Sequence, residues 1–251
     1  MAITAPAPRV LADVLPRSWV QNILLIIGGA ALVGAAAQIS FPLPFSPVPL
    51  TGQTFAVLLV GAALGSARGM ISMLVYGLAG LVGVPWFAGF ASGFAMASFG
   101  YIIGFIVAAG LVGYLAERGW TRTAIDTALA MVLGNVVVYA IGVTWLKFTL
   151  AGTTWAGAVA MGMSPFLLGD GLKIALAAGV FPLVWSQLVK RGLAPREADV
   201  PEVSVSAKAD AEVVQTLDLR DDSEDKIDIT ESSPADATET MKDTQAATRS
   251  D

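Results

Sequence analysis

Apolar residues run along this chain in stretches long enough to cross a lipid bilayer. A helix rises about 1.5 Å per residue, so roughly 20 mostly apolar residues cross the hydrocarbon core. Four stretches meet this length, at residues 19–39, 95–116, 123–146 and 165–189. A fifth, residues 51–81, is too long for one crossing and is interrupted from Gly65 to Gly69, so we expect two short helices there. The pattern therefore predicts six transmembrane helices.

Basic residues flank these stretches unevenly. They lie before the first stretch, between the second and third, between the fourth and fifth, and after the sixth, at Arg9, Arg17, Arg68, Arg118, Arg122, Lys190 and Arg191. The intervening loops at 40–50 and 82–94 carry no charge, and residues 147–164 carry only Lys147. Because basic residues near span ends stay in the cytoplasm, we expect a multi-pass protein of the cell membrane with both termini cytoplasmic.

The charge of −5 averages two different regions. Through Ala194 there are nine bases and four acids, a net charge of +5, whereas residues 195–251 hold 16 acids, six bases and no aromatic residue. Such a tail buries too little apolar surface to offset its ordering entropy. We therefore expect an all-α membrane protein with a cytoplasmic segment at 1–18, a six-helix transmembrane domain at 19–191 and a disordered acidic cytoplasmic tail at 195–251.

Composition argues against several kinds of chemistry. The chain is 55% hydrophobic and has neither cysteine nor histidine, so disulfides and thiolate metal sites are excluded and histidine-based catalysis is excluded too. It has no Gly-x-x-x-x-Gly-Lys-Ser/Thr motif for nucleotide binding. We expect a transport subunit rather than an enzyme, with no cofactor, no metal and no nucleic-acid partner. If transport uses ATP, another chain supplies the ATPase.

The first stretch has a second interpretation. Arg9 and Arg17, an apolar run and the small residues 35–37 resemble a secretory signal with its cleavage site. The run is long for a signal, and apolar sequence continues to Phe41. These features favour a retained transmembrane helix.

Asp170 and Lys173 are the two charges within the apolar stretches that carry information about function. They are three residues apart near the outer end of the sixth stretch, which places both on one helix face. Intramembrane charge is costly unless it is paired or hydrated. One interpretation is an internal ion pair that fixes helix packing. The other is a ligand site, where Lys173 binds a carboxylate and Asp170 accepts from N–H donors.

The outer loops offer further candidates. Four prolines between residues 42 and 49 make the first loop stiff and extended, either as a lid over a pocket or as a loop resting on the membrane interface. The second loop is rich in aromatic residues and glycine, which suits either stacking on a flat ring or an interfacial aromatic belt. Asn135 and Tyr139 form a buried polar pair typical of contacts between helices. The candidate ligand contacts are Asp170, Lys173, Gln53, Trp86, Ser92 and Tyr101.

Small residues recur along the first stretch. Ala30 and Gly34 are four residues apart, and so are Ala31 and Ala35, a spacing that permits close helix approach. Packing inside the six-helix body and contact with another chain remain equally open on this evidence.

Together these segments resemble the BioY family, the biotin-specific substrate-binding (S) components of energy-coupling factor (ECF) transporters. The resemblance covers residues 20–191 and rests on four motifs, at 49–54, 87–89, 100–105 and 169–173. It implies a six-helix subunit that captures biotin from outside, with Asp170 and Lys173 contacting the ligand. It also implies that Ala30, Ala31, Gly34 and Ala35 contact a transmembrane coupling subunit bound to two ABC-type ATPases. Residues 97–100 depart from the Pro-Thr-Gly-Gly type of sequence expected there, which puts contacts near them in doubt.

The main alternative is an ion-coupled secondary transporter of a small carboxylate-bearing solute. Such a protein needs a carboxylate near mid-membrane with discontinuous helices around it. Asp126 lies at the cytoplasmic start of its stretch, so Asp170 is the one acid that we place within the membrane, and it too lies near an end. The sequence therefore favours the importer subunit.

Overall fold

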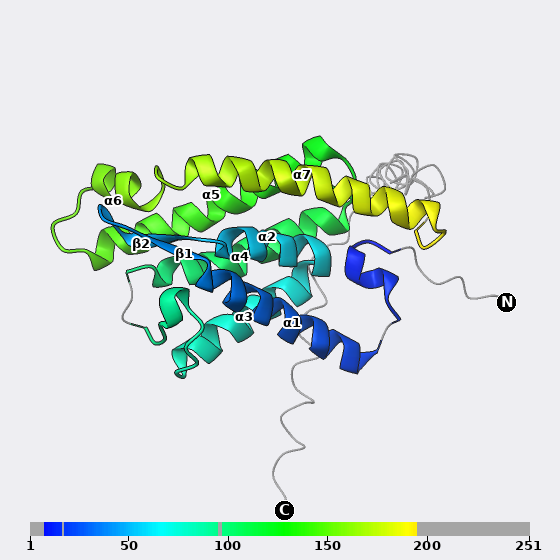
Figure 1. Ribbon diagram of the computed structural model, residues 1–251, viewed down its shortest axis with the longest axis horizontal. Helices are drawn as coiled ribbons and strands as arrows, with labels where there is room; N and C mark the ends of the chain where they lie inside the picture. Colours follow the sequence, from blue (N-terminus) through cyan, green and yellow to red (C-terminus); the bar gives the residue numbers. More distant parts are fainter. Residues whose placement is uncertain (1–7, 17, 95–96, 195–251) are drawn as a thin grey trace, which may run out of the picture. The chain divides into compact units, whose positions relative to one another are not determined.

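The computed structural model describes residues 8–16, 18–94 and 97–194. The predicted disordered tail and part of the predicted N-terminal segment lie outside these residues. The described part holds seven α-helices: α1 (Trp19–Gln38), α2 (Gln53–Leu64), α3 (Ser66–Leu81), α4 (Phe99–Glu117), α5 (Ala124–Thr149), α6 (Trp155–Gly162) and α7 (Leu167–Lys190). It also holds the short 3-10 helices η1 (Leu11–Val14) and η2 (Ala88–Phe90) and the strands β1 (Ser40–Leu43) and β2 (Ser46–Thr51) (Figure 1).

Helix α4 lies at the centre of the helix bundle. It packs against α2, α3 and α5, and 72% of its apolar window is buried, compared with 28% for α1 and 17% for α7. Four described helices, α1, α4, α5 and α7, are long and apolar enough to cross a membrane. Helices α2 and α3 are shorter, with 12 and 16 residues.

The predicted break within residues 51–81 is confirmed at Gly65, which separates α2 from α3. Its φ of 88° is favourable for glycine because it has no Cβ. Close packing holds the two helices against α4: a Cβ at Gly61 would lie 2.6 Å from the carbonyl oxygen of Ala109, and a Cβ at Gly113 would collide with the backbone at Gly65. Glycines at these contacts let helix backbones approach closely without a polar interface.

The expectation of an all-α chain is wrong at the first outer loop, which forms a two-stranded antiparallel hairpin. Strands β1 and β2 pair Ser40 with Thr51 and Leu43 with Ser46. Proline removes an N–H donor, which a strand tolerates at a sheet edge, and both strands here are edge strands. The hydroxyl of Ser46 donates to the carbonyl oxygen of Met161 at 2.8 Å and thereby ties the hairpin to α6.

The third outer loop, expected between residues 147 and 164, is also more ordered than predicted. Helix α5 continues to Thr149 and places Lys147 in its last turn, and α6 follows a short turn. The hydroxyl of Tyr101 donates to the carbonyl oxygen of Gly162 at 2.7 Å, which ties the end of α6 to α4.

The second outer loop is fastened to α1 by Gln38. Its Nε2 atom donates to the carbonyl oxygens of Trp86 at 3.1 Å and Phe87 at 3.2 Å, while its Oε1 atom accepts from the backbone of Phe90 at 3.1 Å. The Phe87 ring is almost fully buried and fills the space beside Gly80, where any side chain would collide with it. The loop is therefore held in place between α1 and α3.

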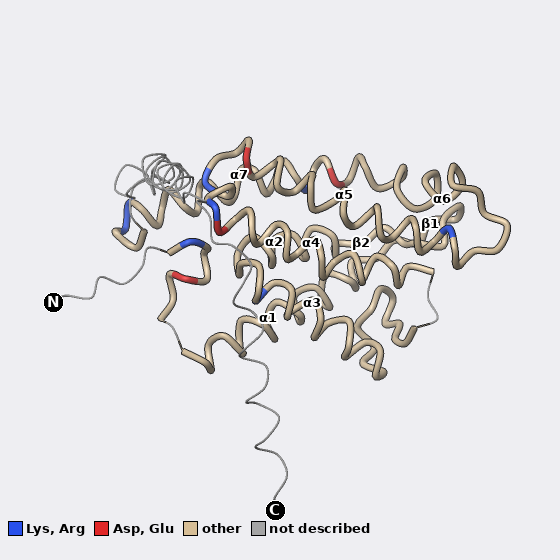
Figure 2. Tube along the Cα trace, turned by 180° about the vertical axis from the view of Figure 1, so that it is seen from behind, with Lys and Arg blue, Asp and Glu red and all other residues tan. Residues whose placement is uncertain are grey.

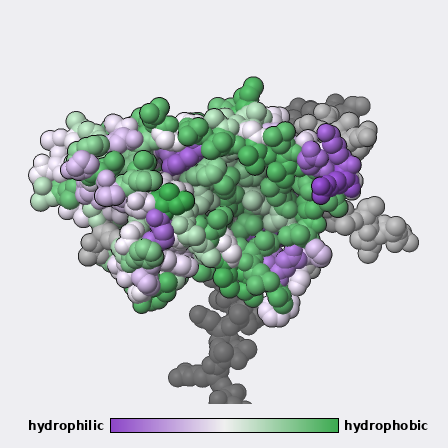
Figure 3. All heavy atoms as spheres, viewed as in Figure 1, coloured by the Kyte–Doolittle hydropathy of each residue, from purple (hydrophilic) through white to green (hydrophobic). Residues whose placement is uncertain are grey.

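Polar and apolar surfaces are separated along the described chain. Figure 2 shows Lys, Arg, Asp and Glu gathered mainly at the end of the bundle where α7 finishes. Figure 3 shows one face dominated by hydrophobic residues between hydrophilic patches. Large apolar side chains such as Trp19, Leu24, Val136, Leu168 and Leu172 are at least half exposed. Such a surface is typical of helices that face lipid.

Candidate functional site

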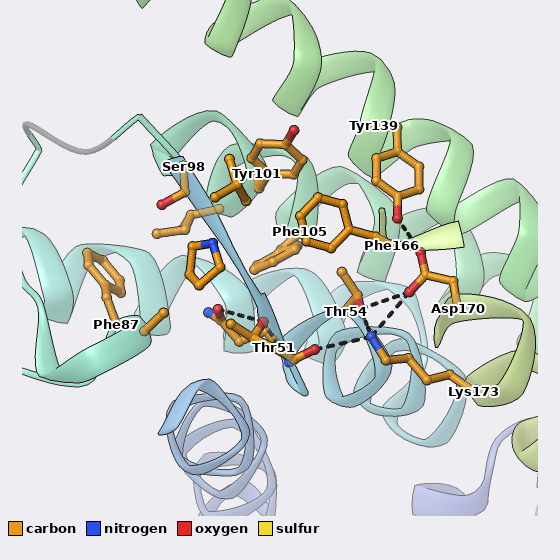
Figure 4. A pocket seen from close by; sticks show the side chains of 15 residues that line it. Thr51, Thr54, Phe87, Ser98, Tyr101, Phe105, Tyr139, Phe166, Asp170 and Lys173 are labelled. Carbon is orange, nitrogen blue, oxygen red and sulfur yellow. Dashed lines mark hydrogen bonds and ion pairs between the residues drawn. The ribbon is translucent and has the colours of Figure 1, made fainter. Parts of the chain in front are cut away.

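A pocket lies beneath the β1–β2 hairpin and above the middle of the bundle. It contains about 570 Å³ of space between protein atoms, part of it open to the surroundings. Its lining comes from the hairpin, the second outer loop and helices α2, α4, α5 and α7: Val48, Pro49, Thr51, Gln53, Thr54, Phe87, Ala88, Ser98, Tyr101, Ile102, Phe105, Tyr139, Phe166, Asp170 and Lys173 (Figure 4).

The charged pair predicted on α7 lines this pocket. Lys173 Nζ lies 3.2 Å from Asp170 Oδ1, and the two side chains are 20% and 5% exposed. The ammonium group also donates to the Thr51 carbonyl oxygen at 3.1 Å and to Thr54 Oγ1 at 2.8 Å. A lysine has three donors. All three therefore have acceptors, and one of these acceptors belongs to the hairpin that covers the pocket.

Asp170 is held from two sides. Its Oδ1 atom accepts from Lys173 and, at 3.5 Å, from the hydroxyl of Thr54. Its Oδ2 atom accepts a hydrogen bond from the hydroxyl of Tyr139 on α5. A carboxylate offers about four lone-pair sites. Asp170 therefore retains acceptor capacity for N–H donors of a ligand.

The pocket walls away from this polar cluster are apolar and aromatic. Ile102 contributes to the lining. Phe105 and Phe166 lie along the pocket, and Phe87 lies near the end that is farther from Asp170 and Lys173 (Figure 4). Flat aromatic faces suit a ligand with a ring system and an aliphatic chain. One end of the pocket thus offers hydrogen-bonding groups, and the walls along the rest of it can shield an apolar part of a ligand from water.

Gln53 and Tyr101 also line the pocket, but their polar groups are largely engaged with protein. Gln53 Nε2 donates to the hydroxyl of Tyr76 at 2.7 Å, and its Oε1 atom accepts from the hydroxyl of Thr51 at 3.2 Å. Tyr101 donates to Gly162 as described above. Both residues therefore shape the pocket and fix the elements around it.

Trp86 and Ser92 lie outside the pocket lining. The indole Nε1 of Trp86 donates to the carbonyl oxygen of Tyr76 at 3.0 Å, and its ring packs against α1 near Gly34. Ser92 is exposed. The neighbouring Phe87 and Ala88 contribute to the pocket instead of Trp86.

Four polar lining residues are not among the candidates chosen from sequence: Thr51, Thr54, Ser98 and Tyr139. Thr54 follows Gln53 directly and lies in the motif at 49–54. Tyr139 was interpreted as a contact between helices. In the sequence, the spacing of Tyr139 from Asn135 indicated a polar face on α5, but it did not indicate which element that face contacts.

The structure divides the small residues of α1 between two faces. Ala30 and Gly34 are buried within the bundle, where Gly34 packs against Trp86. Ala31 and Ala35 are exposed, and a Cβ at Gly28 on the same side would meet nothing within 4 Å. The internal interpretation therefore applies to Ala30 and Gly34, while Ala31 and Ala35 are the members that are accessible to another chain.

Comparison with known sequences shows the family to which this chain belongs. The sequence model of the BioY family matches residues 8–190. The chain belongs to the BioY family. Among BioY proteins, the biotin transporter BioY of Rhizobium etli is 34% identical over 166 residues, which cover 62% of this chain and 88% of that protein. The probable biotin transporter BioY of Pyrococcus horikoshii is 36% identical over 160 residues, which cover 62% and 91%.

A solved structure shares the fold of this BioY family member. It is the S-component for biotin from an ECF-type ABC transporter, which matches with a TM-score of 0.60 and 22% identity over 67% of this chain and 92% of that one. The predicted resemblance to the BioY family and to the S-component fold is thus confirmed.

Proposed function

We propose that this chain is the substrate-capturing membrane subunit of a biotin importer of the ECF type. The observation that carries this proposal is the buried Asp170–Lys173 pair at one end of an otherwise apolar and aromatic pocket. Biotin has a matching division, with a polar ureido ring at one end and an aliphatic chain at the other. Membership of the BioY family and the names of its relatives support the same ligand.

The geometry changes the roles first assigned to the charged pair. The ureido and carboxylate groups of biotin are separated by a bicyclic ring and a chain of four methylene groups. Asp170 and Lys173 are in contact with each other, so one biotin molecule cannot place its two ends on them separately. The ureido ring fits both: one of its N–H groups donates to Asp170, and its carbonyl oxygen accepts from Lys173 in exchange for one acceptor that Lys173 now has.

The aliphatic chain of biotin then extends between the aromatic walls toward Ser98 and Phe87. In this orientation the sulfur ring lies beside Phe105 and Phe166, where burial of apolar surface favours binding by about 25 cal/mol per Å². The hairpin closes over the ligand, and Val48, Pro49 and Thr51 form the cover. A stiff hairpin lowers the ordering entropy that lid closure costs.

We further assign the exposed face of α1 to the coupling subunit, which in turn carries two ABC-type ATPases. Ala31 and Ala35 let a partner helix approach closely. They adjoin an apolar groove that α1, α2 and α7 form together, lined on α1 by Leu24, Gly28 and Leu32 and on α7 by Val180, Phe181 and Val184. Helix α2 forms the floor of this groove. Such a concave surface accepts an apolar helix more readily than a convex surface does.

The proposed topology has six crossings with both termini in the cytoplasm, α2 and α3 each counting as one. The chain has no native cysteine, so single cysteines report cleanly. Phe45 lies exposed at the hairpin turn, and Ala67 lies exposed at the start of α3. Cysteine at position 45 should react with an impermeant thiol reagent added to intact cells, whereas cysteine at position 67 should react only after permeabilisation. The reverse pattern would contradict the topology.

The ligand itself is tested by purification of the chain in mild detergent from cells grown with biotin. Mass spectrometry of the released small molecules should detect biotin in about one copy per chain. Titration of ligand-free protein should then show saturable binding of biotin and none of pantothenate, a carboxylate-bearing vitamin without a ureido ring. Equal binding of both vitamins would contradict the proposal.

A further inference from the structure

Tyr139 of α5 also forms a hydrogen bond with the charged pair, although it lies 31 positions before Asp170 in the sequence. Its hydroxyl donates to Asp170 Oδ2, and both residues are more than nine-tenths buried. Figure 4 shows the Tyr139 ring approaching Asp170 from the side opposite to Lys173. The carboxylate is therefore held between a phenol and an ammonium group.

This arrangement divides the two oxygens of Asp170. Oδ1 accepts from Lys173 and Thr54, and Oδ2 accepts from Tyr139. Because both oxygens accept hydrogen bonds from fixed donors, the orientation of the carboxylate plane is fixed. Part of its lone-pair capacity is already used. A ligand therefore meets a carboxylate that can accept single N–H bonds but is poorly placed to accept a fork of two parallel bonds.

We infer that the Tyr139 hydroxyl is a specificity-determining group, which favours a neutral urea-type ring on Asp170 over a cationic guanidine-type ring. A guanidinium binds best when both oxygens of a carboxylate are free for two parallel N–H bonds. Tyr139 occupies the second oxygen, and Lys173 adds a positive charge 3.2 Å from the first. This inference rests on the proposed function, because it assigns the ureido end of biotin to Asp170.

The ring of Tyr139 has a separate role from its hydroxyl. Tyr139 and Asp170 also border a second groove of about 1100 Å³ between α5, α6 and α7, so the two side chains form the wall between this groove and the pocket. Replacement of Tyr139 by Phe keeps the ring and the wall and removes only the donor. The variant therefore separates the hydroxyl from the packing.

The test measures three ligands on the full chain in detergent: biotin, desthiobiotin, which keeps the urea, and 2-iminobiotin, which has a guanidine in its place. In Tyr139→Phe we expect biotin and desthiobiotin to bind about tenfold more weakly, because the carboxylate loses a hydrogen bond that orients it. We expect 2-iminobiotin to lose less, so that its affinity relative to biotin rises at least fivefold.

The matched control is Tyr114→Phe. Tyr114 is 43% exposed and its ring lies beneath the Arg118 guanidinium, 3.7 Å from the ring centroid, well away from the pocket lining. This change also removes one phenol hydroxyl, and we expect it to leave all three affinities within twofold of wild type.

The outcomes separate the inference from the function on which it rests. An equal loss for all three ligands in Tyr139→Phe, or no loss at all, overturns the inference while biotin binding by the wild type upholds the function. No biotin binding by the wild type overturns the function, and the inference with it. If Tyr139→Phe does not fold on its own, the affinity of 2-iminobiotin relative to biotin is measured in Asp170→Asn and in the double variant Asp170→Asn with Tyr139→Phe. Neither variant has the carboxylate through which the hydroxyl acts, so the two affinity ratios should agree within twofold. A larger difference overturns the inference.

Discussion

Two ion pairs lie near opposite ends of helix α2 and differ in what surrounds them. Among the described residues, Lys173 and Asp170 meet at 3.2 Å, and Arg68 and Asp13 meet at 3.1 Å. The first pair joins residues three apart on one helix, whereas the second joins residues 55 positions apart. The distances are nearly equal, so distance does not distinguish the roles of the two pairs.

Their other contacts do distinguish them. Arg68 also donates to the side chain of Asn22 at 3.0 Å, and Asp13 accepts from the backbone of Val10 at 3.4 Å. That pair therefore ties the N-terminal segment, α1 and α3 together. The pair on α7 joins two turns of a helix that would form without it, yet it borders a pocket and collects partners from β2, α2 and α5. The position of this largely buried pair at the pocket supports the proposal that it contacts a ligand.

The sharpest way to break this comparison is to remove the charges on α7. Lys173→Met or Asp170→Asn should weaken biotin binding by roughly 30-fold or more, because a lost charged hydrogen bond in a desolvated site costs about 2–5 kcal/mol. Binding is measured by titration of ligand-free protein in detergent.

The double variant, Asp170→Asn with Lys173→Met, is the control for folding. It removes both charges, so neither remains unpaired, and we expect a monodisperse protein that still fails to bind biotin. Near-normal biotin affinity in this variant would show that the pair is structural, like the pair at the other end.

The second prediction concerns that other pair. Arg68→Met should lower the free energy of unfolding by about 1–2 kcal/mol, since it removes hydrogen bonds to Asp13 and Asn22 at a partly exposed site. Biotin affinity should stay within twofold of wild type. Thermal unfolding in detergent and biotin titration check the two statements, and a tenfold loss of affinity with unchanged stability would reverse the assigned roles.

The third prediction concerns a buried polar side chain that belongs to neither ion pair. Asn135 lies one turn from Tyr139 on α5 and is buried, and its Oδ1 atom has no hydrogen-bond partner among the described residues. Asn135→Leu should raise the free energy of unfolding by about 1 kcal/mol, because an unpaired buried acceptor is removed. A clear decrease in the unfolding temperature would mean that the amide has a partner, such as a buried water.

The smallest effect is expected from the acidic tail. Deletion of residues 195–251 should leave biotin affinity unchanged within error, because the tail lacks the apolar content to join the helical body. Titration of the truncated protein checks this. A large loss of affinity would show that the tail contributes to binding.

Local features of the sequence predicted the parts of the site that depend on neighbours along one helix. The three-residue spacing of Asp170 and Lys173 places them on one face of any helix, and the structure keeps them together. The length of residues 51–81 and the interruption from Gly65 to Gly69 predicted a break, and the structure places it at Gly65, which has a positive φ. The prolines of the first outer loop predicted an extended backbone but not the pairing of its two halves, which depends on hydrogen bonds between residues far enough apart to form a turn.

The sequence by itself determined the membrane class, the helical stretches and the charged pair, because length, hydropathy and helical spacing are local properties. Only the tertiary structure decided which faces meet. In a soluble helix the apolar stripe marks the buried side, but a membrane helix is apolar all round. Hydropathy therefore could not tell inward Ala30 and Gly34 from outward Ala31 and Ala35, nor show that Tyr139 meets Asp170 while Trp86 turns toward α1. Those choices depend on close packing between helices, which no single stretch of the chain contains.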